Sequence, residues 1–358
     1  MKLLITGATG FVGRHVVAAA LQRGHKVRAV VRPAGTTDAF GALVADDALE
    51  TAQVDLRSPK GVLDAVDGVD SVIHLAAAKA GDFYSQFAGT VTSTENLLSV
   101  MGEVGVRQLV AVSTFSVYDY RNMRSKTLLD EDAPIDVDPE QRDEYARTKL
   151  LQEELYRTFG TEPDHRVVIL RPGMIYGRDE LWHPLLGAEI GPLFVRIGHG
   201  GVMPMIYVEN AAEAMVLAAE RLGDDPSPVD GEVINLVDDD LPSQQGYIDE
   251  VSKVIEVPRT VSVKWPMVRA AARLLEEGND RLVKGRAKFP GIVVPDKLHG
   301  RFKPLHYTNA KAKRLLDWTP RYGLDEAIRR SVAPEAEVFV AVGDDDAAAG
   351  DVGVPPHG

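Results

Sequence analysis

Three glycines near the start of the chain, Gly7, Gly10 and Gly13, are spaced three residues apart. They follow residues 2–6, an apolar run typical of a buried strand. A helical pattern over residues 14–21 comes directly after them. Where no Cβ intervenes, the backbone can approach a phosphate closely, and the free N–H groups and dipole of a helix start favour negative charge. This strand, turn and helix therefore predict a site for the pyrophosphate of a dinucleotide.

The composition excludes several classes of protein and partner. The chain has 358 residues, enough for about two domains, and its formal net charge of −13 argues against a nucleic-acid or anionic-membrane partner. Because there is no Cys, disulfides, thiolate catalysis and Cys-ligated metal are excluded, and we expect no metal site. The sequence shows neither a secretory apolar region nor the ~20 apolar residues of a membrane span, so we expect a cytoplasmic protein.

Strand-like apolar runs alternate with helical patterns over the first half of the chain. This alternation predicts an α/β fold with a Rossmann-type, doubly wound parallel sheet, and continuous apolar strands suit a sheet covered on both faces. The expected strands are residues 2–6, 26–31, 49–55, 72–75, 109–112 and 167–170, and the expected helices are residues 14–21, 59–66, 93–100 and 144–159.

The pattern loosens after this first half, which suggests a division into parts. We expect a dinucleotide-binding domain at residues 1–171 and a smaller, mainly substrate-binding C-terminal lobe at residues 172–333. Residues 206–222 and 232–236 are predicted to return to the first domain. Residues 334–358 are rich in Ala, Gly and Asp, so we expect a disordered acidic tail there.

Tyr145 and Lys149 lie one helical turn apart in a helical pattern, on the same face. A phenol has an unperturbed pKa near 10, and a neighbouring ammonium stabilises the phenolate and lowers that pKa. The pair can therefore transfer a proton to or from a substrate oxygen. Tyr307 and Lys311 repeat the spacing, but no hydroxyl-bearing strand end precedes them at the right distance, so we interpret this second copy as structural.

Together these motifs resemble the extended branch of the short-chain dehydrogenase/reductase superfamily, the NAD(P)-dependent epimerase/dehydratase family, over about residues 1–333. The pattern is most similar to members like 3β-hydroxysteroid dehydrogenase and dihydroflavonol reductase. In this family a Ser or Thr four residues before a Tyr binds the reacting oxygen, and that position is Thr114, before Tyr118. Ser113 and Ser116 remain alternatives for this role.

The resemblance also implies where the cofactor binds and how copies of the chain pair. The family uses the glycine turn for the pyrophosphate, an Asp-Leu turn for adenine, a strand end for the ribose and a loop near the nicotinamide. The implied cofactor residues are Gly7, Thr9, Gly10, Phe11, Val12, Gly13, Arg14, Arg32, Asp55, Leu56, Ala76, Ala77, Lys149, Pro172 and Gly173. A homodimer is implied through helices around residues 93–100 and 144–159. Thr90 departs from the family, which often has Asn there, and this puts a supporting hydrogen bond in doubt.

The choice between NADP and NAD rests on one residue. Enzymes of this architecture that use NAD often place an acid after the second strand, whereas an Arg there accommodates the 2′-phosphate of NADP. Arg32 occupies that place, and Arg14 can add a second cation. We therefore predict NADP as the cofactor, with NAD as the alternative.

The substrate is predicted to be an apolar small molecule. Family members that act on nucleotide sugars use an Asn and an Arg where this chain has Met174 and Met203, and Met, here with Met205 nearby, suits a hydrophobic ligand. We predict an NADP-dependent oxidoreductase that interconverts a carbonyl and a secondary alcohol on a steroid-, flavonoid- or aryl-ketone-like molecule. A nucleotide-sugar epimerase or reductase and a non-catalytic NAD(P)-binding sensor remain alternatives. The sequence fixes neither the substrate nor the direction of reaction.

Overall fold

The fold is built on one parallel sheet of seven strands. The computed structural model describes residues 1–137, 142–182, 186–190, 193–198, 200–283 and 302–334. The sheet order is β12-β7-β5-β4-β1-β2-β3, and every neighbouring pair is parallel. Its strands are β1 (Lys2–Thr6), β2 (Lys26–Val31), β3 (Leu49–Gln53), β4 (Ser71–His74), β5 (Gln108–Val112), β7 (Arg166–Pro172) and β12 (Val233–Leu236). The Rossmann-like sheet predicted from the sequence is confirmed, and its order reverses between β1 and β4, where such sheets bind ligands.

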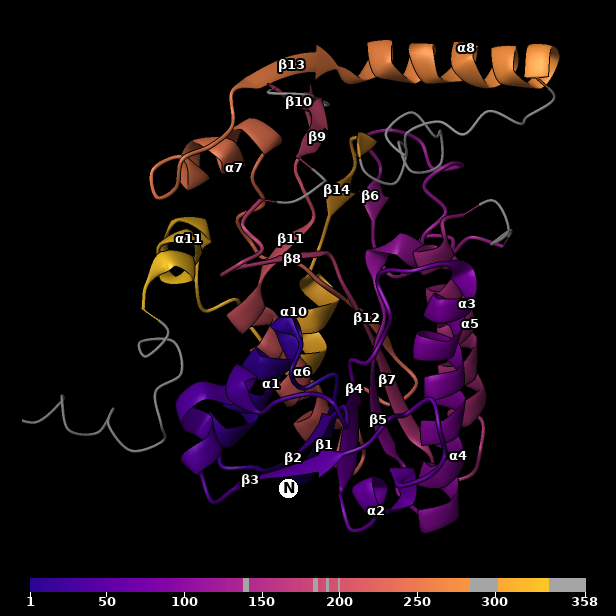
Figure 1. Cartoon of the computed structure of the whole chain (residues 1–358), viewed down its shortest axis with the longest axis vertical. Helices are drawn as coiled ribbons and strands as arrows, with labels where there is room; N and C mark the ends of the chain where they lie inside the picture. Colours follow the sequence, from indigo (N-terminus) through magenta and orange to yellow (C-terminus); the bar gives the residue numbers. More distant parts are fainter. Residues whose placement is uncertain (138–141, 183–185, 191–192, 199, 284–301, 335–358) are drawn as a thin grey trace, which may run out of the picture.

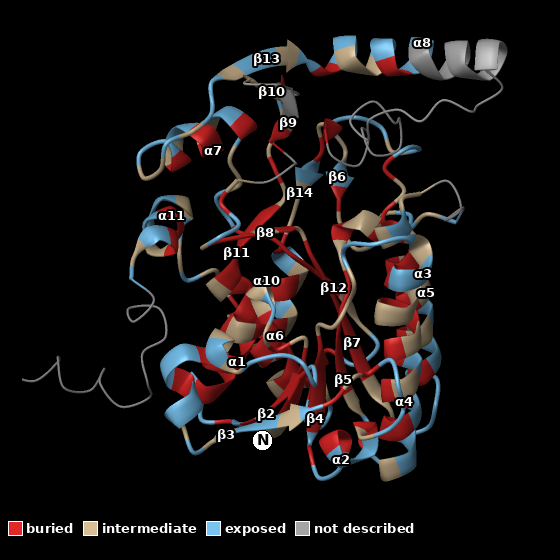
Figure 2. Cartoon of the chain, in the orientation of Figure 1, coloured by how far each residue is buried: buried red, intermediate tan, exposed pale blue. Residues whose placement is uncertain are grey.

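Helices cover both faces of this sheet, which is why its inner strands are largely apolar and buried, whereas the edge strand β3 is partly exposed (Figures 1 and 2). One face carries α1 (Phe11–Gln22), α6 (Val208–Leu222) and α10 (Ala310–Leu316). The other face carries α2 (Val62–Val66), α4 (Ser93–Val104) and α5 (Glu144–Phe159). Each face has its own cluster of buried side chains, so the sheet is the middle of three layers.

The helices differ from the sequence prediction in several places, and α4 ends at Val104 rather than at residue 100. Helix α1 begins at Phe11 rather than at residue 14, because the chain is already helical directly after the glycine turn. Helix α2 begins at Val62, since Gly61 before it has a left-handed φ of +83°. A short helix that we did not predict, α3 (Phe83–Phe87), continues through a π-helical turn, η2 (Ala88–Thr92), into α4.

The remaining elements gather beyond one end of the central sheet (Figure 1). In the part of the chain that the structure describes, they include three small sheets, β13-β10-β9, β11-β8 and β14-β6, together with further helices. The elements are β6 (Leu128–Leu129), β8 (Met174–Tyr176), β9 (Gly187–Ile190), β10 (Leu193–Gly198), β11 (Met205–Tyr207), β13 (Thr260–Lys264), β14 (His306–Tyr307), α7 (Gln244–Val251), α8 (Trp265–Val283) and α11 (Leu324–Val332). The domain division near residue 171 stays a prediction, and the tail predicted from residue 334 lies, beyond its first residue, outside the described part.

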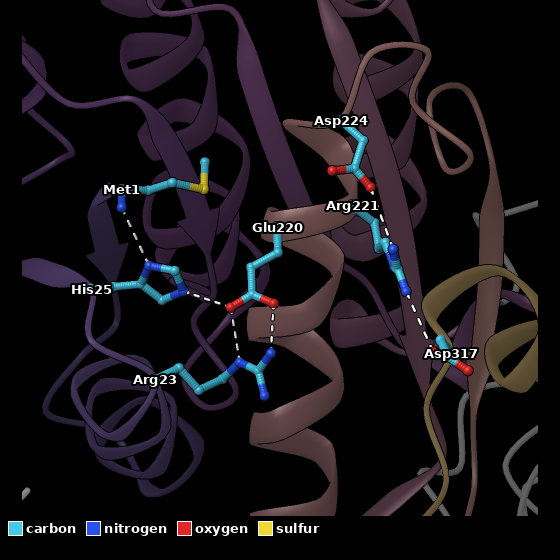
Figure 3. A network of polar contacts seen from close by, with 7 residues as sticks. All are labelled: Met1, Arg23, His25, Glu220, Arg221, Asp224 and Asp317. Carbon is cyan, nitrogen blue, oxygen red and sulfur yellow. Dashed lines mark hydrogen bonds and ion pairs between the residues drawn. The ribbon is translucent and has the colours of Figure 1, made fainter.

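Ion pairs fix α6 on its face of the sheet (Figure 3). Near the end of α6, Glu220 accepts two hydrogen bonds from the guanidinium of Arg23, at 2.8 and 2.6 Å, and lies 2.7 Å from Nε2 of His25. The next residue, Arg221, lies 3.6 Å from Asp317. The helix is therefore joined to the connection between α1 and β2 and to the segment that follows α10.

A buried carboxylate joins the start of α6 to the C-terminal part of the chain. Oδ1 of Asp238 accepts from Nδ2 of Asn210 at 2.8 Å, and its Oδ2 accepts from the backbone N–H of Tyr207 at 2.7 Å. The side-chain oxygen of Asn210 accepts from the backbone N–H groups of Arg321 and Tyr322. Burial raises the pKa of Asp238 to about 7, while these donors oppose that rise.

Candidate active site

The glycine turn between β1 and α1 has the shape that a pyrophosphate site requires. Gly7 has a φ of +67°, and a Cβ on Gly13 would lie 2.1 Å from the carbonyl oxygen of Gly7. Gly10 caps α1 without any side-chain hydrogen bond, and the first turn of the helix has no acidic residue. The helix start therefore presents backbone N–H groups to an anion without competition from a carboxylate. These residues fit a dinucleotide.

The end of β4 lies directly beside this turn. A Cβ on Gly7 would lie 3.1 Å from the backbone nitrogen of Ala76 and from the carbonyl carbon of Leu75. Ala76 and Ala77 are half-buried in the segment that follows the strand. The structure thus brings these predicted ribose-side residues next to the predicted pyrophosphate turn.

Thr114 and Tyr145 come together from different elements. Thr114 follows β5, where its Oγ1 accepts from the backbone N–H of Ser116 at 3.2 Å, and Tyr145 is the second residue of α5. Burial raises the pKa of the Tyr145 phenol, and a hydrogen bond with Thr114 acts in the opposite direction. The Thr114 hydroxyl and the Tyr145 phenol therefore lie within hydrogen-bonding range of each other, so that both could reach one substrate oxygen.

Of the two alternatives to Thr114, Ser113 is engaged elsewhere. Its hydroxyl is buried and donates to Oε1 of Glu153. The hydroxyl of Ser116 accepts a 3.3 Å hydrogen bond from Thr114, so Thr114 lies between Ser116 and Tyr145 in the hydrogen-bond chain. Among the three hydroxyls, the contact with the phenol favours Thr114.

Lys149 is buried on α5, one turn after Tyr145. Its Nζ donates to the carbonyl oxygen of Val112 at 2.7 Å and to Oε1 of Gln152. Burial lowers the pKa of Lys149 to about 7; the charge of Glu153 opposes this, and that of Lys79 adds to it. The ammonium is thus held at the end of β5, on the face of the helix that carries the phenol.

A buried ion pair fixes α5 against the sheet. Nε and Nη2 of Arg171, on β7, donate to the two carboxylate oxygens of Glu153 at 2.8 and 2.7 Å, and the side chains are only 2% and 3% exposed. The guanidinium also stacks over the ring of Tyr118, 4.8 Å from its centroid. Burial raises the pKa of Glu153, but the paired guanidinium and Ser113 outweigh it, so that the pKa is lowered.

Sequence reasoning missed Gln152, Glu153 and Arg171. The spacing of Glu153 offered a signal, since it follows Lys149 by four residues and so lies on the same helix face. Arg171 offered a second signal. It directly follows a predicted apolar strand, and a charged side chain that is buried there needs a partner of opposite charge.

Of the cations assigned to the 2′-phosphate, Arg32 is exposed just after β2, at the same end of the parallel sheet as the glycine turn. Arg14 lies on the first turn of α1, where Nη2 donates to Asp179 at 3.1 Å. In the predicted adenine turn, the carboxylate of Asp55 is paired with Arg57 at 2.7 Å, which lowers the pKa of Asp55. The cofactor roles of these residues stay predictions.

The three methionines assigned to the substrate are all buried. Met174 is the first residue of β8 and pairs with Met205, the first residue of β11, and Met203 lies two residues before it. All three belong to a cluster that includes the rings of Tyr176 and Tyr207. Gly173, assigned to the nicotinamide loop, packs against this segment, because a Cβ there would lie 2.3 Å from the carbonyl oxygen of Pro204.

Phe115, the residue that follows Thr114, belongs to a cluster of aromatic side chains. The ring of Phe115 lies 5.6 Å from that of Tyr118 and 5.9 Å from that of Tyr307. Tyr307 is on β14, whereas Lys311 is on α10 and pairs with Glu232 at 2.7 Å. The second copy of the Tyr-Lys spacing therefore does not share a helix face.

Among the described residues, none of the helices has the length and apolar composition that a membrane span requires. The same residues contain no group of His, Asp and Glu arranged to hold a metal ion.

Comparisons with known proteins agree with this geometry. Residues 3–236 match the NAD dependent epimerase/dehydratase family. The chain is 30% identical to 4-hydroxy-2-methyl-3-oxo-4-farnesyl-3,4-dihydroquinoline-1-oxide ketoreductase of Stigmatella aurantiaca, over 92% of this chain and 96% of that protein. It is 27% identical to 3 beta-hydroxysteroid dehydrogenase/Delta 5-->4-isomerase of Mycobacterium tuberculosis, over 94% and 91%.

A solved structure supports the fold. UDP-glucuronic acid 4-epimerase from Bacillus cereus, in complex with NAD, superposes with a TM-score of 0.67 at 21% identity and covers 92% of this chain and 97% of its own.

Replacing Glu153 by Gln should destabilise the protein strongly. The change leaves the buried guanidinium of Arg171 without a charge partner, which costs about 3–5 kcal/mol. Glu154→Gln is the matched control, since its exposed side chain should change stability by no more than about 0.5 kcal/mol. Urea unfolding followed by circular dichroism measures both; equal stability of the two variants would contradict a dominant role for the pair.

Proposed function

The chain belongs to the NAD dependent epimerase/dehydratase family, within the extended short-chain dehydrogenase/reductases, and from that premise we propose that it is an NADP-dependent oxidoreductase. Its reaction interconverts a carbonyl and a secondary alcohol on an apolar small molecule. The observation that carries the proposal is the contact of Thr114 with Tyr145, with Lys149 buried one turn further along α5.

Each of these residues has a distinct part in the reaction. When bound, the nicotinamide ring gives or takes the hydride at the reacting carbon. Thr114 donates a hydrogen bond to the substrate oxygen, and the Oη of Tyr145 gives that oxygen a proton in reduction and removes it in oxidation. Lys149 holds the ribose hydroxyls, and its charge lowers the cost of forming the phenolate.

The surroundings of the site support an apolar substrate. The ring of Phe115, which follows Thr114 in the sequence, lies 5.9 Å from that of Tyr307, and Met174 and Met203 fill the positions where polar groups serve nucleotide sugars in the family. Two relatives are named for a ketoreductase and a steroid dehydrogenase, which are activities of this class. Steroids, flavonoids and aryl ketones are therefore the first substrates to screen, with nucleotide sugars as the test of the competing epimerase.

We also propose that two copies pair through α4 and α5. The support is that α5 carries two partly exposed leucines, Leu150 and Leu151, outside the buried face of the helix. Such a contact would stabilise the helix that carries Tyr145 and Lys149.

Tyr145→Phe should retain cofactor binding and lose turnover. The substitution removes only the hydroxyl that transfers the proton, a contribution of about 10²–10⁴-fold in rate. Steady-state rates from nicotinamide absorbance measure the loss, and cofactor fluorescence measures binding. A Phe variant that turns over like the wild type would show that another group transfers the proton.

Arg32→Asp should reverse the cofactor preference. A hydrogen bond to a charged group contributes about 1.5–3 kcal/mol, so Arg32 predicts a preference for NADPH over NADH of roughly ten- to a hundredfold. A carboxylate at this position repels the 2′-phosphate and accepts from a free 2′-hydroxyl. Titration of both proteins with NADPH and NADH measures the preference; equal or tighter NADH binding by the wild type would contradict the role of Arg32.

A further inference from the structure

A buried hydrogen-bonded chain starts at the residue that precedes the glycine turn. Oγ1 of Thr6 accepts from the backbone N–H groups of Leu75 and Ala76, at 3.1 and 3.2 Å, and lies 2.7 Å from Nδ1 of His74. Both lone pairs of this hydroxyl are thus occupied, so its hydrogen must be donated to Nδ1. His74 is therefore the tautomer with its hydrogen on Nε2, and burial lowers its pKa to about 3, which keeps it neutral.

The next member of the chain is Thr94, on α4. The Nε2–H of His74 donates to Oγ1 of Thr94 at 2.9 Å, and this hydroxyl donates its own hydrogen to the carbonyl oxygen of Thr90 at 2.6 Å. Thr94 can therefore only accept from any further partner. That requirement decides how the next side chain is oriented.

Gln152, on α5, is the further partner. Its Nε2 lies 2.8 Å from Oγ1 of Thr94 and must donate to it, because the Thr94 hydroxyl has no hydrogen left. The amide is therefore fixed with its Oε1 toward Nζ of Lys149, which donates to it. The 3.4 Å approach of Nε2 to His74 joins two donors and adds no bond. Thr6, His74, Thr94 and Gln152 are all completely buried.

We propose that Gln152 is a positioning residue, which holds the Lys149 ammonium through a hydrogen-bond chain of fixed direction that runs from Thr6 at the glycine turn. The inference rests on the proposed function, because it concerns the lysine of the same site. An ammonium has three hydrogens. Val112 and Gln152 take two of them, which leaves one for the ribose or the phenol.

Thr90 does not supply this support. Its hydroxyl accepts from the backbone N–H of Ala78 at 3.0 Å, and its carbonyl oxygen accepts from Thr94. The sequence left it open whether Thr90 makes the supporting hydrogen bond that an Asn often makes in the family. Gln152, on the same helix as Lys149, accepts a hydrogen bond from the lysine instead. No other side chain in the described part of the chain is shown to accept from Nζ.

Other titratable groups also act on Lys149, and the test must separate them from Gln152. Glu153 on α5 favours the ammonium, although its carboxylate is paired with Arg171 of β7. Lys79, in the segment after β4, disfavours it. His74 of β4 is neutral, and Tyr145 precedes the lysine on α5.

The experiment measures the lysine itself, so it does not depend on finding a substrate. In protein labelled with ¹³C at the lysine Cε, the signal that disappears in Lys149→Met is assigned to Lys149 and followed over pH. We expect a midpoint near pH 7 in the wild type. Gln152→Leu removes the acceptor and should lower the midpoint by about one pH unit, whereas Gln152→Glu places a carboxylate at Nζ and should raise it.

Gln108→Leu is the control, because it removes an amide at the opposite end of β5 and should leave the midpoint unchanged. Thermal melts establish that each variant folds. If Gln152→Leu does not fold, the midpoint measured in Gln152→Glu tests the proposal. A midpoint that neither variant moves, or that Gln108→Leu moves as far, would overturn the proposal. A wild type that turns over no carbonyl or alcohol would refute the proposed function instead and leave this titration intact.

Activity gives a second readout that a purely structural role would not move. If Lys149 is neutral at pH 7 in Gln152→Leu, the phenolate of Tyr145 loses the positive charge beside it. Alcohol oxidation should then fall about tenfold at pH 7, and the rise of kcat should shift to higher pH. An unchanged pH profile in Gln152→Leu would also contradict the proposal.

Discussion

The buried ion pair between Glu153 and Arg171 is the interaction on which the arrangement of the site depends. It joins α5, which carries Tyr145 and Lys149, to β7 in the central sheet. The same carboxylate accepts from Ser113, at the end of β5, one residue before Thr114. One carboxylate therefore fixes the helix and the strand end that supply the three proposed catalytic side chains.

The other half of the site depends on backbone geometry. The turn after β1 must pass close to itself and to the end of β4, and only glycine leaves that space at positions 7 and 13. Thr6, His74, Thr94 and Gln152 connect this turn to Lys149 without leaving the protein interior. Buried polar contacts, rather than a loop, thus join the turn proposed to bind the phosphates to the residues proposed to transfer the proton.

Sequence patterns predicted the alternating strands and helices of the central sheet. Apolar runs and the glycine spacing predicted the parallel sheet, and the Tyr145–Lys149 spacing predicted a shared helix face. The pairing of α5 with the sheet was not predicted: Glu153 and Arg171 each offered a signal, but they are 18 residues apart and meet only when α5 packs on β7. Gln152 was missed for the same reason: its role follows from the hydroxyls of other elements that fix the orientation of its amide.

The most direct test of the account is the fate of the hydride in the reaction of the wild-type protein. Reduction of a steroid or aryl ketone with NADPH deuterated at C4 of the nicotinamide should give an alcohol that carries deuterium on the carbinol carbon, and mass spectrometry detects it. An alcohol formed without deuterium from either C4-labelled epimer of the cofactor would contradict the account. So would a protein that leaves these ketones unchanged and instead epimerises a nucleotide sugar without net consumption of cofactor.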